Sequence, residues 1–589
     1  MKKLITTILT TALLTIANNA QAVVFLWNNT GTNWTSPTSW TNGVQPSSTS
    51  SSTTTDEIQF GNVGANNNTV VLTSATRAAQ NITFLTNANA YNINSFNGAQ
   101  TLSSRAGITN NSTATQTFNI LVENANNSNT WFQTAGGELV FNNVASLTTA
   151  SSSTSRLLTL AGDGAFTFNN ELRQGGSATG GRVLYTGNGT VTFNGTNILG
   201  GGFEIKGGGT VNVNGGTGMG TGLITIAAAT GTTNGPKLII NTTNGLSVAN
   251  SFKGSSSLST MATLDLLAGN DTNAVMTFVV NQYQGNNMSF TNHGIGKTLL
   301  QFTNASNILT SSTDNSGGRR LINNSASLTI QFDVTLDIGS TTADVNIVGG
   351  AGDFLFKGSL LNTASVLRGL TKTGTGTVTL QAVNTYNGET IVQDGTLIVN
   401  GSLQSPLTTV NNGALLGGSG SLQGVLLNRG TISAGNSAGL LSMNSLNASN
   451  GNFIFELGAP SSRGITYDAI DVSSLLTLGT DTDFTFETLN NYVFADGDTY
   501  DLFNWGSADM TNFNVSVLEA ALPSLASTPE LTWNVSQFTL DGSVSVSIIP
   551  EPTVLELITA PWQALKALCR MQAEFAEQNP VIATIQTGI

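Results

Sequence analysis

The sequence is poor in the residues that carry most protein chemistry. Its 589 residues include one cysteine and one histidine, and 20 Lys and Arg stand against 33 Asp and Glu, giving a formal net charge of −13. The lone Cys569 excludes a disulfide scaffold, and Cys569 and His293 are too few for a zinc cluster. The shortage of basic residues excludes a nucleic-acid binder, which needs a cationic surface to meet phosphates. Hydrophobic residues still make up 39%, which predicts a folded core rather than disorder.

The first residues have the pattern of a secretory signal peptide. Two lysines follow Met1, an uncharged apolar run covers residues 4–17, and the small residues Ala20 and Ala22 occupy A-x-A positions. The apolar run has about 14 residues, whereas a bilayer span needs ~20. We therefore predict that signal peptidase removes residues 1–22, and that the chain is an exported bacterial protein that does not rely on disulfides.

The body of the chain is a series of short alternating runs separated by glycine and asparagine, which predicts strands and turns. A unit of the form G-x-G-x-Φ-x-Φ, where Φ is apolar, occurs four times, and neighbouring copies are 25 and 24 residues apart. The copies begin at Gly162, Gly187, Gly350 and Gly374. Longer blocks also align, residues 186–215 with residues 373–401. Such self-similarity is typical of a repeat architecture.

The period of about 17–26 residues has the length of one coil of a β-solenoid, in which each strand pairs with its equivalent in the next coil. Glycine permits corners with positive φ, and asparagine does so at low cost and can stack in ladders. Outward-facing Thr, Ser and Asn keep a chain with few charges soluble. A chain of β-sandwich domains, the alternative, would lack a constant period. We predict an all-β solenoid over residues 61–457.

The segment 371–401, preceded by Leu370, completes the string LTKTGTGTVTLQAVNTYNGETIVQDGTLIVNG and resembles the autotransporter-associated β-strand repeat. The continuations GGSG at residues 417–420 and SAGNSAG at residues 433–439 are similar to that family, although Ala434 stands where the family commonly has proline. The resemblance implies a right-handed β-helix in an exported surface protein, and no catalytic activity.

The segment 23–60 contains Trp27, Trp34 and Trp40 and resembles the start module of the same protein group. We predict that the three indoles pack as a cap over the first coil, because the open end of a solenoid exposes strand edges. The alternative is a glycan-binding platform, since indole faces stack on sugars.

Residues 458–549 are predicted to form a small C-terminal β module that closes the solenoid. Its end leads into Pro550, Glu551 and Pro552 and resembles the end of PEP-CTERM proteins. In that family the triplet precedes a membrane helix and an Arg-rich end, and an exosortase sorts the protein to the outer surface.

The tail 550–589 departs from that pattern. Glu556, Pro561 and Lys566 interrupt its apolar run, and only Lys566 and Arg570 are basic. We therefore identify it as a degenerate PEP-CTERM-like sorting tail and expect no stable membrane span in the mature chain.

One stretch is rich in carboxylates and holds no lysine or histidine. Its members are Asp468, Asp471, Asp481, Asp483, Glu487, Asp496, Asp498 and Asp501. The favoured interpretation is solvated loops of a capping module. The alternatives are a weak Ca²⁺ site at Asp496 and Asp498, or catalytic carboxylates. His293 is predicted to fill a turn rather than to act as a base.

The chain is therefore expected to be a secreted, non-enzymatic protein of the bacterial cell surface or extracellular matrix, sorted by an exosortase. Expected partners are signal peptidase, the exosortase and extracellular polysaccharide; no nucleic acid and no cofactor are expected. A glycan-binding adhesin is the first alternative. A polysaccharide-active β-helix enzyme is the second, and it would need carboxylates from successive coils in one groove.

Overall fold

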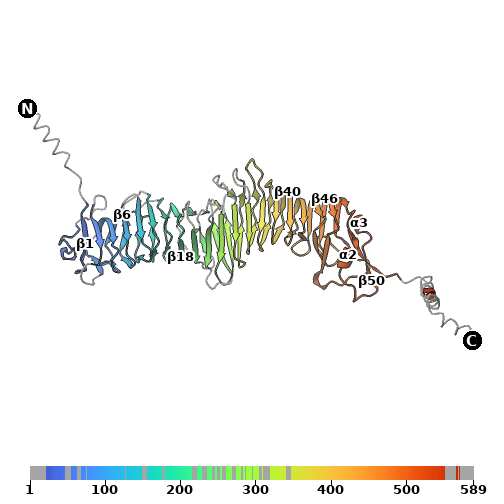
Figure 1. Ribbon diagram of the computed structural model, residues 1–589, viewed down its shortest axis with the longest axis horizontal. Coiled ribbons are helices and arrows are strands. Elements are labelled where there is room, and N and C mark those ends of the chain that lie inside the picture. The colour runs from blue at the N-terminus through green and yellow to red at the C-terminus, as the bar shows by residue number, and fades with distance from the viewer. Residues whose placement is uncertain are drawn as a thin grey trace, which may run out of the picture.

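A computed structural model describes residues 22–550 with internal gaps, together with residues 565–567 and 570. The longest gaps are 47–54, 149–154, 228–234, 255–260, 310–318 and 340–345. The described chain is a long stack of short strands, and the first and last strands lie at opposite ends of it (Figure 1). Ala20 of the predicted signal peptide, and Glu551 and Pro552 of the predicted sorting motif, lie outside the described residues. Within the described part of the chain, no helix combines the length and apolarity needed to span a membrane.

Three long sheets of parallel strands make up the stack. The first sheet contains β1 (Val24–Trp27), β2 (Glu57–Phe60), β4 (Thr76–Phe84), β6 (Thr101–Asn110), β9 (Ser128–Gln133), β12 (Leu157–Ala161), β15 (Arg182–Tyr185), β17 (Gly202–Ile205), β19 (Ile224–Ile226), β22 (Phe252–Lys253) and β25 (Tyr283–Gln284). The third sheet contains β21 (Leu246–Val248), β24 (Asn273–Val279), β27 (Lys297–Thr303), β30 (Leu328–Phe332), β33 (Asp353–Phe356), β36 (Thr377–Leu380), β39 (Thr396–Val399), β41 (Leu415–Gly418), β43 (Thr431–Ala434), β45 (Asn452–Leu457) and β47 (Asp483–Thr488).

The central sheet runs the length of the stack. It contains β3 (Thr69–Leu72), β5 (Asn92–Ser95), β7 (Thr115–Asn119), β10 (Glu138–Phe141), β13 (Ala165–Phe168), β16 (Thr190–Phe193), β18 (Thr210–Asn214), β20 (Lys237–Asn241), β23 (Ala262–Leu267), β26 (Asn287–Asn292), β29 (Arg319–Asn323), β32 (Asn346–Gly350), β35 (Leu370–Thr373), β38 (Thr390–Val392), β40 (Ser402–Asn411), β42 (Ser421–Asn428), β44 (Leu440–Ala448), β46 (Ala469–Leu478) and β49 (Phe503–Asp509). Shorter parallel strands complete the coils: β8 (Leu121–Asn124), β11 (Ala145–Ser146), β14 (Leu172–Arg173), β28 (Ile308–Leu309), β31 (Thr335–Asp337), β34 (Leu360–Leu361) and β37 (Val383–Asn384). The fold is therefore the predicted all-β solenoid; its right-handed winding stays a prediction.

The repeated glycine unit stacks on itself as the sequence predicts. β13 pairs with β16 so that Phe168 lies over Phe193, and their ring centroids are 5.2 Å apart. In the second half β33 pairs with β36, which places Phe356 over Leu380. These apolar side chains are buried, and the residues between them face outward. Strand pairing in register therefore converts the 24- and 25-residue periods into a continuous core.

The same unit lies on different sheets in the two halves. β13 and β16 belong to the central sheet, whereas β33 and β36 belong to the third sheet. The first sheet ends at β25 and the third begins at β21, so the exchange occurs over residues 246–284, which we name the handover segment. The glycine units before this segment therefore lie on the central sheet, and those after it lie on the third sheet, which forms another face of the coil.

An asparagine ladder lies along the N-terminal half of the central sheet. The Nδ2 of each member donates to Oδ1 of the member one coil earlier, over 2.8, 2.7, 2.7, 2.6 and 2.8 Å. The members are Asn94, Asn119, Asn142, Asn169, Asn194 and Asn214. All five amide hydrogen bonds point the same way along the stack, an arrangement in which each bond polarises the next.

The N-terminal end is filled by tryptophan. Trp27, Trp34 and Trp40 are 0%, 0% and 1% exposed, and Trp40 meets the other two rings edge to face at 5.1 and 5.3 Å. Trp40 Nε1 donates to the backbone oxygen of Trp34 at 2.9 Å, next to the short helix η1 (Pro37–Ser39). This burial contradicts the alternative of a glycan platform at these residues, because a sugar stacks only on a ring face that solvent reaches.

The C-terminal end continues the solenoid beyond the predicted boundary at residue 457. β44 pairs with β46 and β46 with β49 in parallel, and β45 pairs with β47. The last coil is closed by an antiparallel sheet, β48 (Thr499–Asp501), β51 (Ser543–Ile548) and β50 (Leu531–Asn534), with η2 (Leu489–Asn491), α2 (Val515–Ala521) and α3 (Phe538–Asp541). The predicted boundary is too early because the last repeat motif recognised in the sequence ends at residue 439, whereas parallel strand pairing continues to β49.

Candidate functional site

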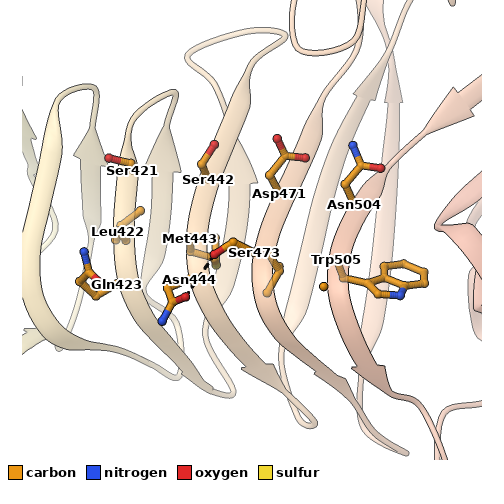
Figure 2. A pocket seen from close by; sticks show the side chains of 12 residues that line it. Ser421, Leu422, Gln423, Ser442, Met443, Asn444, Asp471, Ser473, Asn504 and Trp505 are labelled. Atoms are coloured by element: carbon orange, nitrogen blue, oxygen red, sulfur yellow. Dashed lines mark hydrogen bonds between the residues drawn. The ribbon is translucent and has the colours of Figure 1, made fainter.

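A groove of about 760 Å³ crosses the outer face of four successive strands, β42, β44, β46 and β49 (Figure 2). Its lining residues are Ser421, Leu422, Gln423, Ser442, Met443, Asn444, Asp471, Val472, Ser473, Asn504, Trp505 and Gly506. Concave surfaces with convergent polar groups are where proteins hold ligands. We take this groove as the candidate site.

The strand register is interrupted within the groove. The pairing of β44 with β46 shifts register between Met443 and Leu446, and that of β46 with β49 shifts between Val472 and Leu475. A β-bulge bends its strand and increases the local twist. Both shifts come from one extra residue in β46, because Met443 to Leu446 on β44 pairs with the longer stretch Val472 to Leu476 and the pairing with β49 shows the same excess. The pairing of β42 with β44 keeps its register. Among these four strands the bulge therefore lies in β46, which it bends within the groove.

The outward side chains form two polar rows. The first follows the strand register, Ser421 to Ser442 to Asp471 to Asn504, and Figure 2 shows these four in a line across the strands. The second lies two positions further along each strand and consists of Gln423, Asn444, Ser473 and Gly506. Ser473 Oγ donates to Asn444 Oδ1 at 3.1 Å. The groove thus presents hydroxyl and amide groups from four coils.

The groove carries one carboxylate, and it is already paired. Arg463 Nη1 lies 2.7 Å from Asp471 Oδ1. Arg463 also donates from Nε to the backbone oxygen of Asp501 and from Nη2 to that of Ile470, at 2.8 and 3.1 Å. The guanidinium is therefore held by the protein itself. Glycoside hydrolysis uses two carboxyl groups across the scissile bond, and the groove lining contains only Asp471.

Trp505 lies at the C-terminal end of the groove. Its side chain is half-buried and extends from β49 away from the other three strands (Figure 2). A Cβ at Gly542 would lie 2.8 Å from the indole. The turn before β51 therefore supports one side of the ring at the end of the groove.

The acidic stretch contributes structure rather than an open cluster. Asp468 is 0% exposed and accepts hydrogen bonds from the backbone nitrogens of Gly439 and Glu456, both at 2.8 Å. Burial raises the pKa of Asp468 to about 7, and the nearby carboxylates of Glu456 and Glu487 add to the rise. The prediction that the stretch forms solvated loops is therefore wrong for Asp468.

The proposed calcium pair is engaged by protein donors. Asp496 Oδ1 accepts from the backbone nitrogen of Ile548 at 3.1 Å, and Asp498 Oδ2 accepts from that of Ala495 at 2.8 Å. Asp498 also accepts from the hydroxyl of Tyr492. In the part of the chain that the structure describes, no three His, Cys, Asp or Glu side chains come together in a metal-binding group.

His293 belongs to a small ionic cluster at the middle of the central sheet. Its Nδ1 lies 2.7 Å from Asp265 Oδ1, and Lys237 Nζ lies 2.5 Å from Asp265 Oδ2. The His293 side chain is 60% exposed, whereas Asp265 is 2% exposed. Burial alone would raise the pKa of Asp265, but hydrogen bonds from Lys237, His293 and Thr291 outweigh it and lower that pKa overall. The cluster joins β20, β23 and the residue after β26.

Sequence reasoning missed one buried cation. Lys372 on β35 is 0% exposed, and its Nζ donates to the backbone oxygens of Thr373, Gly374 and Asp394 at 3.1, 2.6 and 2.9 Å. Burial lowers the pKa of Lys372 to about 8, partly offset by Asp394 and Asp353. The alternation of β35 could have predicted this burial, because side chains two positions apart face the same side of a strand and Leu370 faces the core.

These buried corners coincide with a recognised sequence family. Residues 370–399 match the passenger-associated-transport-repeat. In this structure the passenger-associated-transport-repeat spans β35 to β39, and Lys372 ties its two glycine corners together. The match confirms the predicted autotransporter-associated repeat over these residues; the PEP-CTERM signal stays a prediction. No curated protein and no solved structure matches the chain.

Proposed function

We propose that the protein is a secreted, non-enzymatic β-solenoid of the bacterial cell surface or extracellular matrix. The observation that carries the proposal is the passenger-associated-transport-repeat at residues 370–399, set within one continuous stack of parallel strands. Passenger segments are exported parts of surface proteins, and a solenoid supplies a stiff rod because backbone ladders run along its axis.

The proposal includes sorting at both ends. The pattern at residues 1–22, ending on Ala22, supports export and removal by signal peptidase. The triplet Pro550, Glu551 and Pro552 is separated by one residue from β51, the last strand of the described chain, and supports processing by an exosortase once the solenoid is outside. The net charge of −13 supports a rod that repels its neighbours and stays dispersed.

Mass spectrometry of protein recovered from the cell surface and the medium tests the proposal. We expect a mature N-terminus at Val23 and a C-terminus near Pro550, with no peptide from residues 562–589. Recovery of the complete chain, with Met1 and Ile589, from the cytoplasm would overturn export. Surface protein that retains residues 552–589 would overturn exosortase processing and leave secretion standing.

A further inference from the structure

We propose that the groove over β42, β44, β46 and β49 binds an uncharged polysaccharide, one chain lying along the axis of the stack, without cleaving it. The proposal goes beyond the display function above and does not depend on it, because it concerns the surface of one folded segment.

The shape of the groove selects an extended ligand. The strands that form it are neighbours in one sheet, and strands in a sheet lie about 4.8 Å apart. The groove therefore extends over about 14 Å across four strands, at right angles to them. The first polar row contributes one outward side chain from each coil at the same register position, so its contacts repeat along the axis. A polymer with a regular repeat meets such a surface several times, whereas a compact ligand meets it once.

The chemistry of the lining selects a polyhydroxylated ligand. Serine hydroxyls at residues 421, 442 and 473 and the amides of Gln423, Asn444 and Asn504 each donate and accept hydrogen bonds. The apolar lining residues Leu422, Met443 and Val472 are buried beneath the polar rows. A protein partner or a lipid surface would need exposed apolar area at the centre of its contact. Sugar hydroxyls instead match groups that act as donor and acceptor at once.

The charge of the groove selects an uncharged chain. Asp471 is its only carboxylate, and Arg463 pairs with it while also donating to two backbone oxygens. No lining residue is a lysine or an arginine, so an anionic polymer would find no cation in the lining. The whole chain has a net charge of −13 and repels polyanions at long range.

Trp505 supplies the apolar contact that a sugar ring needs. A chain that follows the axis leaves the polar rows at β49, where the half-buried indole stands. Indole rings combine a large apolar face with one polar edge and suit sites that are apolar on one side and wet on the other. Gly542 supports the ring from one side, so its orientation is fixed before the ligand arrives.

Affinity electrophoresis of the purified mature protein tests the proposal. The native gels contain dextran, mixed-linkage β-glucan or galactomannan as uncharged polymers, and polygalacturonate or alginate as acidic ones. We expect retardation by at least one uncharged polymer and by neither acidic polymer. No retardation by any uncharged polymer, or retardation by the acidic polymers alone, would overturn the proposal. Shortening of the bound polymer, followed by viscosity, would overturn the absence of cleavage.

Variants locate the binding. Ser473→Trp fills the groove and Asn444→Ala removes one amide from it, and we expect about tenfold weaker binding for the first and a smaller loss for the second. Two matched controls leave the groove intact. Asn428→Ala removes an exposed amide at the other end of β42, and Ser419→Trp adds the same indole at an exposed position outside the groove. Equal weakening by groove and control variants of unchanged thermal midpoint would overturn the site.

A spectroscopic readout follows Trp505 directly. Uncharged polymer should change the tryptophan emission of the native protein, and Trp505→Phe should remove most of that change while retaining the fold. A change that persists in Trp505→Phe would show that the polymer lies elsewhere and would overturn the proposed path of the chain.

Discussion

The Nζ of Lys372 lies 2.9 Å from the backbone oxygen of Asp394, and the two residues belong to successive coils. The same ammonium group donates to Gly374, so one side chain joins two stacked corners whose glycines have φ values of +69° and +64°. Contacts of this kind between coils lead to five predictions.

Replacing Lys372 with methionine should lower stability, because three backbone oxygens lose their common donor. An unpaired buried polar group costs about 1–3 kcal/mol, so the loss should be several degrees in the thermal midpoint. Circular dichroism checks it. Lys357→Met, at an exposed lysine after β33, is the control and should leave the midpoint within one or two degrees.

The same lysine should make stability depend on pH. Burial lowers its pKa to about 8 from 10.5 in the unfolded chain, so between these values the unfolded state binds more protons and stability rises with pH. Above pH 10 the tyrosines oppose this, since burial raises the pKa of Tyr91 to about 12. Denaturant midpoints between pH 7.5 and 10 should rise in the native protein and stay flatter in Lys372→Met. An identical slope in both would contradict the assignment.

Asp468 should act in the opposite sense at the C-terminal end. Burial raises the pKa of Asp468 to about 7 from 3.8. The stabilisation that its protonated form gives to the folded state is therefore fully present below pH 4 and is lost as pH rises through 7. The last coils should become easier to cleave with a protease as pH increases over that window. Asp468→Asn should flatten this dependence, whereas Asp481→Asn, at an exposed aspartate, should leave it unchanged.

The stacked glycine corners should not tolerate a side chain. A Cβ at Gly187 would lie 1.9 Å from the backbone oxygen of Gly162 one coil earlier, so Gly187→Ala forces the coils apart. We expect a loss of about 1–3 kcal/mol or more. Gly413 has a φ of +80° and open space around it, so Gly413→Ala should cost only about 1 kcal/mol of backbone strain. Equal losses in urea denaturation would show that packing between corners is not the cause.

The asparagine ladder should weaken most when it is cut in the middle. Asn142 donates to Asn119 and accepts from Asn169, so Asn142→Ala removes two hydrogen bonds, whereas Asn214→Ala at the end removes the one to Asn194. Each exposed bond contributes about 0.5–1 kcal/mol. Asn142→Ala should therefore lower the denaturation midpoint about twice as far. A larger effect of Asn214→Ala would contradict a cooperative ladder.

The sequence pattern predicted the strands, the corners and the inward-facing residues, because these depend on neighbouring residues in the chain. The glycine unit that begins at Gly162 and Gly187 specified both corners and the inward Phe168 and Phe193, and the strands pair in that register. Burial of Trp27 and its neighbours fits the need to fill an open end. The handover segment left no such signal, because strand and turn residues look alike whichever face they occupy.

The groove could not be predicted for a related reason. Its rows consist of residues such as Ser442 and Asn444, which are the same types that cover the outer surface everywhere. The bulge in β46 that interrupts the register there depends on pairing between coils, which a local pattern does not specify. The burial of Asp468 was missed in the same way, since one of its donors, Gly439, lies one coil earlier and the other, Glu456, lies across the loop between β45 and β46.

The handover segment also determines how the gene can change in length. A coil duplicated within residues 162–214 would insert between strands that already pair with strands of similar sequence. The strands on each face of the solenoid would therefore stay on that face. A duplication that included residues 246–284 would instead displace every downstream unit by another face and bring unlike strands together. Natural length variants should therefore gain or lose whole coils on either side of this segment and carry the segment itself once.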